Sequence, residues 1–234
     1  MTTPLGKDAP LETTLERFTA ILDELGLSAE AVAWFNPLPH VHSVQLQLAR
    51  CPLITANGKG TSREAALASG LGELIERLAT HQSFSDYFLG LANSGAEFVH
   101  FPDERWLPVT NDDDPLPENL LTPTLREFYQ NGAPLHLGDL VDLQSSSYAR
   151  GVCCLPFTNA RNAAEVLFPV NLLDNLYGTN GMSAGNTGYE ALVQALSEIL
   201  ERHVRREVVS RGLALPEVPA EVLKRHAPAD AILA

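Results

Sequence analysis

The sequence predicts an α+β protein in which mixed or antiparallel sheets pack against long helices. Three observations predict this class. Two long stretches carry apolar residues at helical spacing, and several short stretches alternate or run apolar as strands do. These elements follow one another without the regular strand–helix–strand order of a parallel α/β fold. The chain has 234 residues, 45% of them hydrophobic and 19% charged, which is enough to bury a sizeable core.

The first part of the chain predicts a helix, a pair of strands and a longer helix. Apolar residues recur at helical spacing within residues 11–25, and Gly26 is typical of a helix end. Residues 41–49 alternate as a strand, and residues 51–56 are expected to pair with it across a tight turn. Residues 57–60, Asn-Gly-Lys-Gly, are expected to form a turn. A long helix should then run over about residues 62–80.

The rest of the chain is less regular until a second long helix. Residues 101–123 are rich in proline and acidic residues and are expected to form loops. A loop of glycine and small polar residues, 177–188, precedes a long helix over about 188–210, and a further helix begins in the tail. Shorter elements are expected between these two regions: a helix at 126–130 and buried strands within 138–144, 151–157 and 165–173.

The overall charge limits the partners. A formal net charge of −13 gives the chain no electrostatic attraction for nucleic acid or for an anionic membrane surface. No apolar run approaches the length of a membrane span, and the N-terminus lacks the pattern of a signal peptide. The three cysteines include no Cys-x-x-Cys pair, which favours a reducing compartment. The sequence therefore predicts a cytoplasmic protein and leaves homo-oligomer formation open.

One motif occurs twice, at the same place in each long helix. Residues 72–77 read GELIER and residues 197–202 read SEILER. Each copy follows a loop of glycine and small polar residues, so the sequence predicts an internal pseudo-duplication of a loop–helix unit. The equivalent charged residues are Glu73, Glu76 and Arg77 in the first helix and Glu198, Glu201 and Arg202 in the second.

Both helices combine a broad apolar face with a narrow stripe of carboxylates and small polar groups that contains no lysine. If both stripes face one cavity, four glutamates converge, and like charges raise one another's pKa unless a cation is present. Mg²⁺ fits such a site, because it prefers carboxylate oxygens and is usually shared with substrate phosphates. A carboxylate-bridged di-iron centre is a weaker alternative, because it usually requires Glu-x-x-His rather than Glu-x-x-Glu.

A simpler interpretation needs no ligand. The stripes are then the solvated faces of amphipathic helices, and each first glutamate forms an ion pair with the arginine four residues later. Thr61-x-x-Glu64 and Thr187-x-x-Glu190 each fit a capping box, so that Glu190 would only cap its helix. The repetition of the whole array favours the metal site.

The motifs resemble those of the YcaO family. The similarity is carried by GKGTSREAALASGLGELIER and by NGMSAGNTGYEALVQALSEILER, and it extends through all 234 residues. DLQSSSYARGVCCLPFT and LPVTNDDDPLPENLL resemble the branch that works outside peptide natural-product gene clusters. Members of that branch are regarded as accessory factors for methylthiolation of a small-subunit ribosomal protein. The resemblance implies that residues 1–234 are the N-terminal part of a YcaO ATP-binding domain, without its remainder and without a C-terminal helical region.

The resemblance also implies a reaction and its cofactors, ATP and Mg²⁺. Family members activate a backbone amide: a nucleophile adds to the carbonyl, the resulting oxygen attacks the γ-phosphate, ADP leaves, and phosphate is then eliminated. The matching positions imply four Mg²⁺ ligands, Glu73, Glu76, Glu198 and Glu201. They imply nucleotide contacts from Lys7, Thr14, Ser69, Asn186, Glu190, Gln194 and Arg202.

Two hypotheses for the function remain open at this point. The chain is part of an ATP- and Mg²⁺-dependent amide-activating enzyme, or it is a non-catalytic accessory module that binds a methylthiotransferase and a ribosomal protein. The glutamates are essential to the first hypothesis and dispensable to the second. Lys59 in Gly-Lys-Gly stands in a pattern that lacks the spacing of a P-loop, so it is either a phosphate contact or a solvated turn residue.

Overall fold

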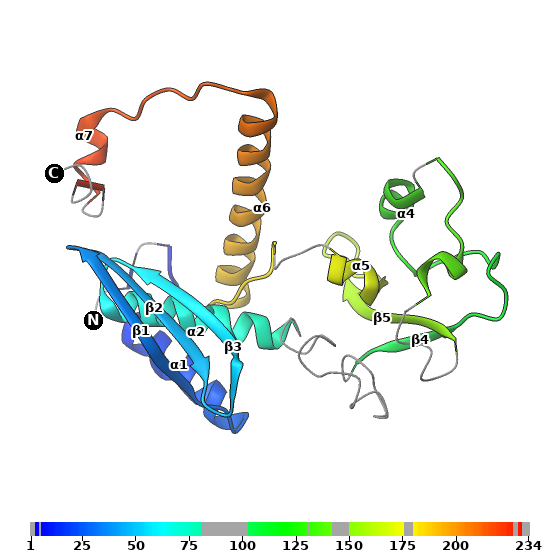
Figure 1. The fold of residues 1–234 in the computed structure, drawn as a ribbon, viewed down its shortest axis with the longest axis horizontal. Helices are drawn as coiled ribbons and strands as arrows, with labels where there is room; N and C mark the ends of the chain where they lie inside the picture. The colour runs from blue at the N-terminus through cyan, green and yellow to red at the C-terminus, as the bar shows by residue number, and fades with distance from the viewer. Residues whose placement is uncertain are drawn as a thin grey trace. The chain divides into compact units, whose positions relative to one another are not determined.

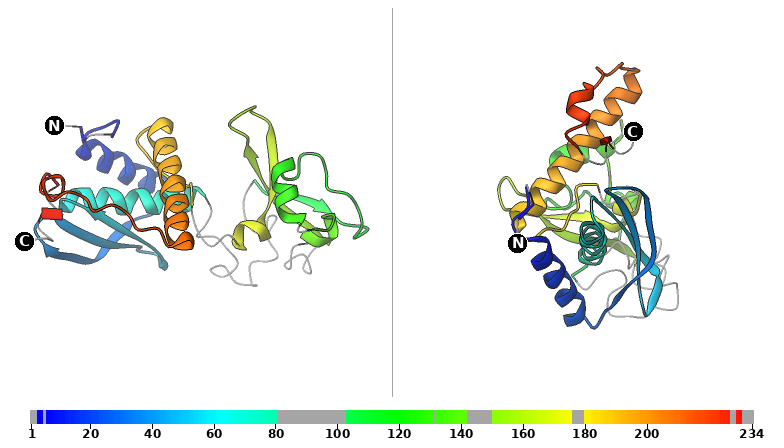
Figure 2. Two further views of the ribbon diagram at one scale, coloured as in Figure 1. Left: turned by 90° about the horizontal axis from the view of Figure 1, so that it is seen from above. Right: turned by 90° about the vertical axis from the view of Figure 1, so that its left-hand side faces the viewer.

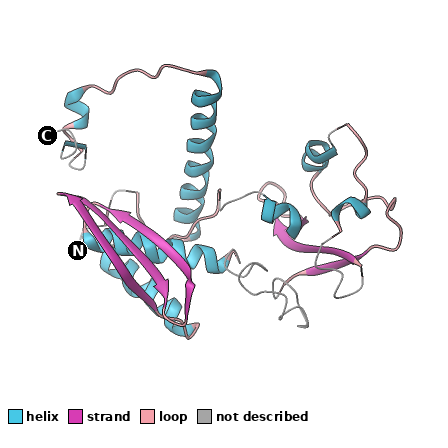
Figure 3. Cartoon of the chain, viewed as in Figure 1, coloured by secondary structure: helices cyan, strands magenta, loops and turns pink. Residues whose placement is uncertain are grey.

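The computed structural model describes residues 3–4, 6–80, 103–130, 132–141, 150–175, 180–226 and 229–230. The chain forms two compact units, one made of residues 1–83 and 179–234, the other of residues 84–178. Each unit combines an antiparallel sheet with helices (Figures 1 and 3), so the predicted α+β class is confirmed. No helix among these residues is long and apolar enough to cross a membrane.

The first unit is built on a three-stranded antiparallel sheet in the order β1 (Ala29–Leu38), β2 (Val41–Leu48) and β3 (Cys51–Gly60). Helix α2 (Arg63–Ala79) packs on β2 and β3, and α1 (Leu11–Glu24) packs against α2. Figure 2 shows α2 lying along the sheet. The two helices begin and end close to where the sequence predicts.

The core of this unit forms because apolar side chains from the central strand meet one face of α2. Val44 and Leu46 on β2, and Leu74 on α2, are fully buried. Burial of side chains of this size contributes about 1.5–3 kcal/mol each. Leu71 and Leu78 continue the same face of α2. The apolar half of the repeated motif therefore has a structural role in the first helix.

The expected turn at residues 57–60 is wrong, because these residues continue strand β3. A Cβ atom on Gly58 would lie 1.9 Å from the carbonyl oxygen of Ala66, and one on Gly60 would lie 2.5 Å from the amide nitrogen of the same residue. The glycines are thus needed where the backbone of α2 approaches the strand, and not for chain reversal. Lys59 is a strand residue paired with Ser43.

The second long helix, α6 (Gly188–Arg211), extends away from the sheet in both Figures 1 and 2 and ends at Gly212 in the left-handed conformation, with a φ of 59°. The sequence predicted a broad apolar face on both long helices. Within the described part of the chain, that face is covered on α2 but exposed on α6. The exposed apolar side chains of α6 include Leu192, Val193, Leu196, Ile199, Leu200 and Val204. Beyond α6, the tail contains the short helix α7 (Ala220–Leu223).

The second unit is a three-stranded antiparallel sheet with short helical segments. The strand order is β4 (Arg105–Pro108), β5 (Gly151–Thr158) and β6 (Glu165–Pro169). The helical segments are α4 (Pro123–Gln130), a 3₁₀ turn at Leu137–Leu140 and α5 (Val170–Asn175). Cys153 and Cys154 are buried in β5, as expected for a buried strand within residues 151–157.

Three local predictions in this unit are wrong or incomplete. Residues 105–108, expected in a loop, form β4 because they pair with the buried strand β5. Residues 137–140 form a 3₁₀ turn instead of a strand, stabilised by a hydrogen bond of 2.9 Å from His136 N to the Asp139 carboxylate. Residues 142–149 lie outside the described residues. The apolar run at 165–173 divides into β6 and the start of α5, since Pro169 cannot continue a ladder of strand hydrogen bonds.

Candidate functional site at the start of α6

The two long helices begin in the same way, which confirms the pseudo-duplication in local geometry. Ser62 is the N-cap of α2 and accepts a hydrogen bond of 3.1 Å from Ala65 N. Thr187 is the N-cap of α6 and accepts one of 3.1 Å from Glu190 N. The glycine two residues before each cap also allows the same close backbone approach: a Cβ atom on Gly185 would lie 2.7 Å from Ala191 N.

The capping-box prediction is therefore only partly correct. In α2 the cap is Ser62 and not Thr61, which leaves Ala65 at the third helical position. In α6 the cap is Thr187, as predicted, and Glu190 takes the third position. Thus α6 carries a carboxylate at a position where α2 carries only a methyl group.

The Glu190 carboxylate binds three donors from outside its helix. Lys7 Nζ lies 3.2 Å from Oε1, Asp8 N lies 2.9 Å from Oε2, and Asn186 Nδ2 lies 3.1 Å from Oε2. The Glu190 side chain is only 5% exposed. A buried carboxylate is costly unless it is paired and hydrogen-bonded, and here it is both. The interpretation of Glu190 as merely a helix cap is wrong.

Opposing effects act on the pKa of Glu190. Burial alone raises the pKa, because it disfavours the charged form. The hydrogen bonds from Asp8 N, from Asn186 and from the Lys7 ammonium group, together with the charge of Lys7, outweigh burial and hold the pKa below its usual value. Glu190 is therefore a carboxylate at neutral pH, and it keeps the Lys7 ammonium group at the first turn of α6.

Thr14 reaches the same place from α1. Its hydroxyl lies 3.1 Å from Asn186 Oδ1 and 3.1 Å from Pro10 O, and the residue is buried. The structure thus brings together four of the residues predicted to contact a nucleotide, although more than 170 positions separate the two pairs in the chain. These four residues are Lys7, Thr14, Asn186 and Glu190.

The first glutamate of each repeated motif forms the ion pair expected for the simpler interpretation. Glu73 Oε1 lies 2.5 Å from Arg77, and Arg77 Nη1 also donates a hydrogen bond of 2.7 Å to Thr55 O on strand β3. Glu198 Oε1 lies 2.9 Å from Arg202 Nη2. Glu198 Oε2 additionally lies 3.4 Å from Gly181 N in the preceding loop.

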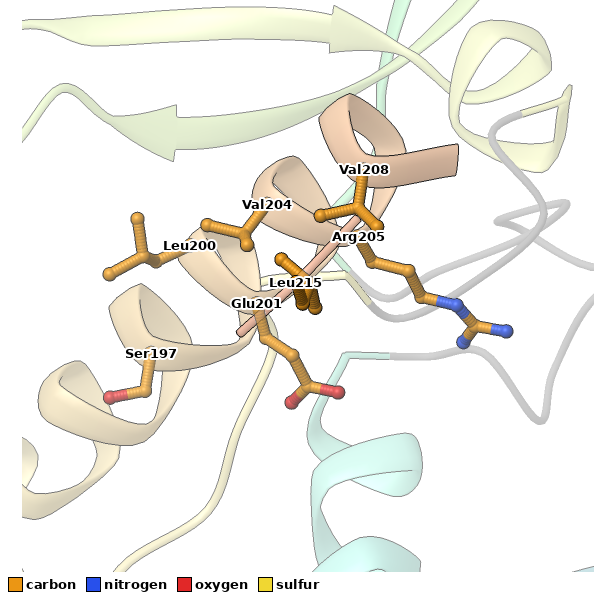
Figure 4. Close-up of a pocket in the computed structure, with 7 residues that line it drawn as sticks. All are labelled: Ser197, Leu200, Glu201, Val204, Arg205, Val208 and Leu215. Carbon is orange, nitrogen blue, oxygen red and sulfur yellow. The ribbon is translucent and has the colours of Figure 1, made fainter. Parts of the chain in front are cut away.

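The remaining predicted residues lie on the two long helices. Ser69 is exposed on α2, Gln194 is exposed on α6, and Glu76 is half-buried on α2. Glu201 is exposed and lines an open pocket of about 530 Å³ along α6, next to Arg205 (Figure 4). The other lining residues are mostly apolar: Ser197, Leu200, Val204, Val208 and Leu215.

The predicted convergence of four glutamates does not appear in the described part of the chain, where no group of three or more His, Cys, Asp or Glu side chains is arranged to hold a metal ion. The donor chemistry nevertheless fits Mg²⁺, since all four predicted ligands supply hard carboxylate oxygens. The assignment of Glu73, Glu76, Glu198 and Glu201 to Mg²⁺ stays a prediction.

Sequence reasoning missed Asp8. It lies next to Lys7, its backbone N–H binds Glu190, and its carboxylate accepts a short hydrogen bond from the Thr187 hydroxyl. No spacing rule could have found it, because its partners lie at the other end of the chain. The only signal in the sequence is that Asp8 lies between Lys7 and Thr14, two residues predicted to contact the nucleotide.

Comparison with known proteins identifies the family to which the sequence is similar. Residues 57–234 match the family model described as YcaO cyclodehydratase, ATP- and Mg²⁺-binding. The ribosomal protein S12 methylthiotransferase accessory factor YcaO of Escherichia coli is 47% identical over 221 residues, which are 94% of this chain and 38% of that protein. An uncharacterized protein of Haemophilus influenzae is 43% identical over 230 residues, which are 98% of this chain and 39% of that protein. The chain thus spans less than two-fifths of the length of the curated relatives it matches.

A solved structure agrees at the level of the fold. YcaO from Methanopyrus kandleri, bound with AMPPCP and Mg²⁺, superposes with a TM-score of 0.56 at 18% identity, covering 96% of this chain and 53% of that one. The description of the family as ATP- and Mg²⁺-binding agrees with the predicted cofactors and not with a di-iron centre. The repeated glutamate motif, the fold and the family match over most of the chain together lead to one conclusion: the chain belongs to the YcaO family.

Proposed function

We propose that this chain binds Mg²⁺-ATP at the start of α6 and that it activates a backbone amide by phosphorylation, in the service of methylthiolation of a small-subunit ribosomal protein. The observation that carries the nucleotide site is the meeting of Lys7, Thr14, Asn186 and Glu190. The Lys7 side chain is 46% exposed, so the same ammonium group that contacts Glu190 is accessible to a phosphate from solvent. The E. coli relative's name supports the accessory role, and the proposal includes the cytoplasm as the location.

In this proposal each group has a distinct task. Lys7 supplies a positive charge to the phosphates, and Asn186 and Thr14 supply neutral hydrogen-bonding groups. Glu73, Glu76, Glu198 and Glu201 hold Mg²⁺, which when bound neutralises the charge that develops on the phosphates. Arg202 can exchange its exposed contact with Glu198 for a contact with the nucleotide. Ser69 and Gln194, on the same helical stripes as the glutamates, are proposed as further nucleotide contacts.

The proposed chemistry is transfer of the γ-phosphoryl group from ATP to an amide oxygen. A nucleophile adds to the amide carbonyl, the resulting oxygen attacks phosphorus, and ADP departs; elimination of phosphate then completes the substitution. Positioning and charge neutralisation carry most of the catalysis in such a transfer. A ribosomal protein and a methylthiotransferase are the partners in this proposal.

Titration calorimetry tests the site. Mg²⁺ with AMPPCP, a non-hydrolysable ATP analogue, is titrated into the wild-type chain and into Lys7→Ala, Glu190→Gln and Glu198→Gln. We expect each variant to weaken binding by about tenfold or more, the effect of losing one charge-assisted contact. A suitable control is Glu207→Gln, which removes a carboxylate of α6 that pairs with the exposed Arg211. If the wild type and the three site variants bind the nucleotide equally well, the proposed site is wrong. If the wild type does not bind it at all, the function proposed for this chain is wrong.

The alternative function is that of a non-catalytic accessory module, which the exposed apolar side of α6 favours because it provides a contact surface. Phosphate release in the presence of the ribosomal protein substrate separates the two. An amide-activating enzyme loses this release in Glu198→Gln and retains it in Glu207→Gln. A binding module assists methylthiolation to the same extent in both variants.

A further inference from the structure

Asp8 joins the N-terminal segment to α6 at two points. Its backbone N–H donates to Glu190 Oε2 at 2.9 Å, and its carboxylate accepts a short hydrogen bond from the Thr187 hydroxyl. The hydroxyl of Thr187 simultaneously accepts from Glu190 N at 3.1 Å, so it is used both as donor and as acceptor. The negative charge of Asp8 lies at the N-terminal end of a 24-residue helix, where the helix dipole stabilises it.

The rest of the segment depends on this contact for its placement. A backbone hydrogen bond of 3.1 Å from Lys7 N to Pro4 O forms a turn on one side of Asp8. On the other side, Ala9 is buried and Pro10 is the N-cap of α1. Pro10 makes no side-chain cap bond, so its side chain cannot hold the start of α1 in place. Between the side-chain contacts of Lys7 with Glu190 and of Thr14 with Asn186, the two contacts of Asp8 hold the chain itself against α6.

We propose that Asp8 is a positioning residue, which holds the segment from Lys7 to Thr14 on the first turn of α6 and thereby sets the Lys7 ammonium group for a nucleotide phosphate. The inference rests on the proposed function and adds a residue that neither the motif nor the family match assigns. Asp8 acts through Lys7 and does not touch the nucleotide. Thr187 is the partner that fixes Asp8, in addition to capping α6.

The α2 repeat shows why the contact is specific to α6. Ser62 caps α2 in the same geometry as Thr187 caps α6, but the third helical position of α2 is Ala65, which offers no carboxylate to a neighbouring segment. A cap needs only the hydroxyl and the backbone N–H, so the aspartate is not required for helix initiation. Asp8→Ala therefore leaves the cap of α6 and the backbone hydrogen bond to Glu190 in place, and removes only the contact of the carboxylate with Thr187.

A double-mutant cycle on nucleotide affinity tests the inference. Mg²⁺ with AMPPCP is titrated into the wild type, Asp8→Ala, Lys7→Ala and the double variant. We expect Asp8→Ala to raise the Kd by about tenfold, the factor that one hydrogen bond to a charged group supports. In the Lys7→Ala background the same substitution should raise the Kd by less than twofold, because a residue that acts through Lys7 has nothing left to position.

Two further variants distinguish positioning from a general effect on the fold or on charge. Asp8→Asn keeps an acceptor oxygen for Thr187 and the backbone N–H for Glu190, so it should restore most of the affinity. Asp112→Ala removes an exposed carboxylate that pairs with Arg150 in the other compact unit, with the same change in net charge, and should leave the Kd unchanged.

The outcomes separate the two proposals. Binding by the wild type with an unchanged Kd in Asp8→Ala overturns the positioning role alone. The positioning role alone is also wrong if the changes in binding free energy caused by Asp8→Ala and Lys7→Ala are additive in the double variant. Absence of binding by the wild type overturns the proposed function and, with it, this inference.

Discussion

At the scale of single residues, Glu190 shows how a charge becomes acceptable in a buried place. It is buried, yet Lys7, Asp8 and Asn186 supply donors to both carboxylate oxygens. Removing a partner from such a group costs more than the pair contributes, because the remaining group stays desolvated. The cluster therefore links stability to the protonation of one side chain.

The first prediction concerns Glu190→Gln and pH. The folded pKa of Glu190 lies below its usual value of 4.5, so its contribution to stability is present above that pH and is lost as the pH falls through the folded pKa. At pH 7 we expect the variant to lose about 1–2 kcal/mol of unfolding free energy. Urea unfolding at pH 7, and at decreasing pH below 4.5, measures the difference between wild type and variant. A difference that stays constant over this range contradicts the assignment.

The second prediction compares two equivalent arginines. Arg77 is half-buried and contacts both Glu73 and Thr55 O, whereas Arg202 is exposed and contacts Glu198. Arg77→Ala should cost about 1–2 kcal/mol of unfolding free energy, since it leaves a strand carbonyl without its donor. Arg202→Ala should cost less than about 0.5 kcal/mol, as exposed ion pairs usually do. Denaturant titration of both variants checks the ranking, and equal losses would show that the contact with Thr55 is unimportant.

At the scale of elements, the repeat gives two helices of similar sequence with different surroundings. Helix α2 covers β2 and β3 with its apolar face, and glycines in β3 allow the close approach. The equivalent face of α6 is exposed within the described residues. The same amphipathic pattern therefore has different energetic consequences, because burial and not the pattern supplies the free energy.

The third prediction uses this difference. Leu71 on α2 is 6% exposed, and its equivalent on α6, Leu196, is 56% exposed. Leu71→Ala should destabilise the protein by about 2–5 kcal/mol, the usual cost of emptying a core position. Leu196→Ala should change stability by less than about 0.5 kcal/mol. Thermal or urea unfolding provides the comparison. A large loss for Leu196→Ala would show that the apolar face of α6 is covered in solution.

At the scale of the whole molecule, the proposed site belongs to one compact unit. Every predicted nucleotide or Mg²⁺ contact lies in residues 1–83 or 179–234, and the unit of residues 84–178 contributes none. The chain also spans less than two-fifths of the curated relatives it matches. The first unit thus contains both halves of the repeat, and ligand binding should stabilise it selectively.

The fourth prediction follows from that selectivity. Hydrogen exchange with and without Mg²⁺ and AMPPCP should show added protection of the segments 7–14 and 186–194, because ligand binding suppresses local opening around its site. Strand β5 in the other unit should exchange at the same rate in both conditions. Equal added protection in both units would contradict a site confined to the first.

The sequence by itself determined the fold class, the bounds of the long helices and the repeated glutamate motif, since helical periodicity, caps and motif spacing are all local properties. The same locality explains the failures. Glycines that serve close packing in β3 look like turn residues, and β4 forms only because β5 pairs with it. The glutamates of the repeated motif also predict a Mg²⁺ site, but whether they converge depends on how two helices far apart in the sequence meet.

Only the tertiary structure decided which residues meet at the start of α6. Lys7 and Asp8 lie more than 180 positions from Glu190, so no spacing in the sequence could predict that they share its carboxylate. The structure also decided that the apolar face of α2 is buried while that of α6 is exposed, although the two patterns are alike. Long-range packing, and not local preference, assigns these roles, because burial and charge pairing depend on neighbours that the chain brings together only on folding.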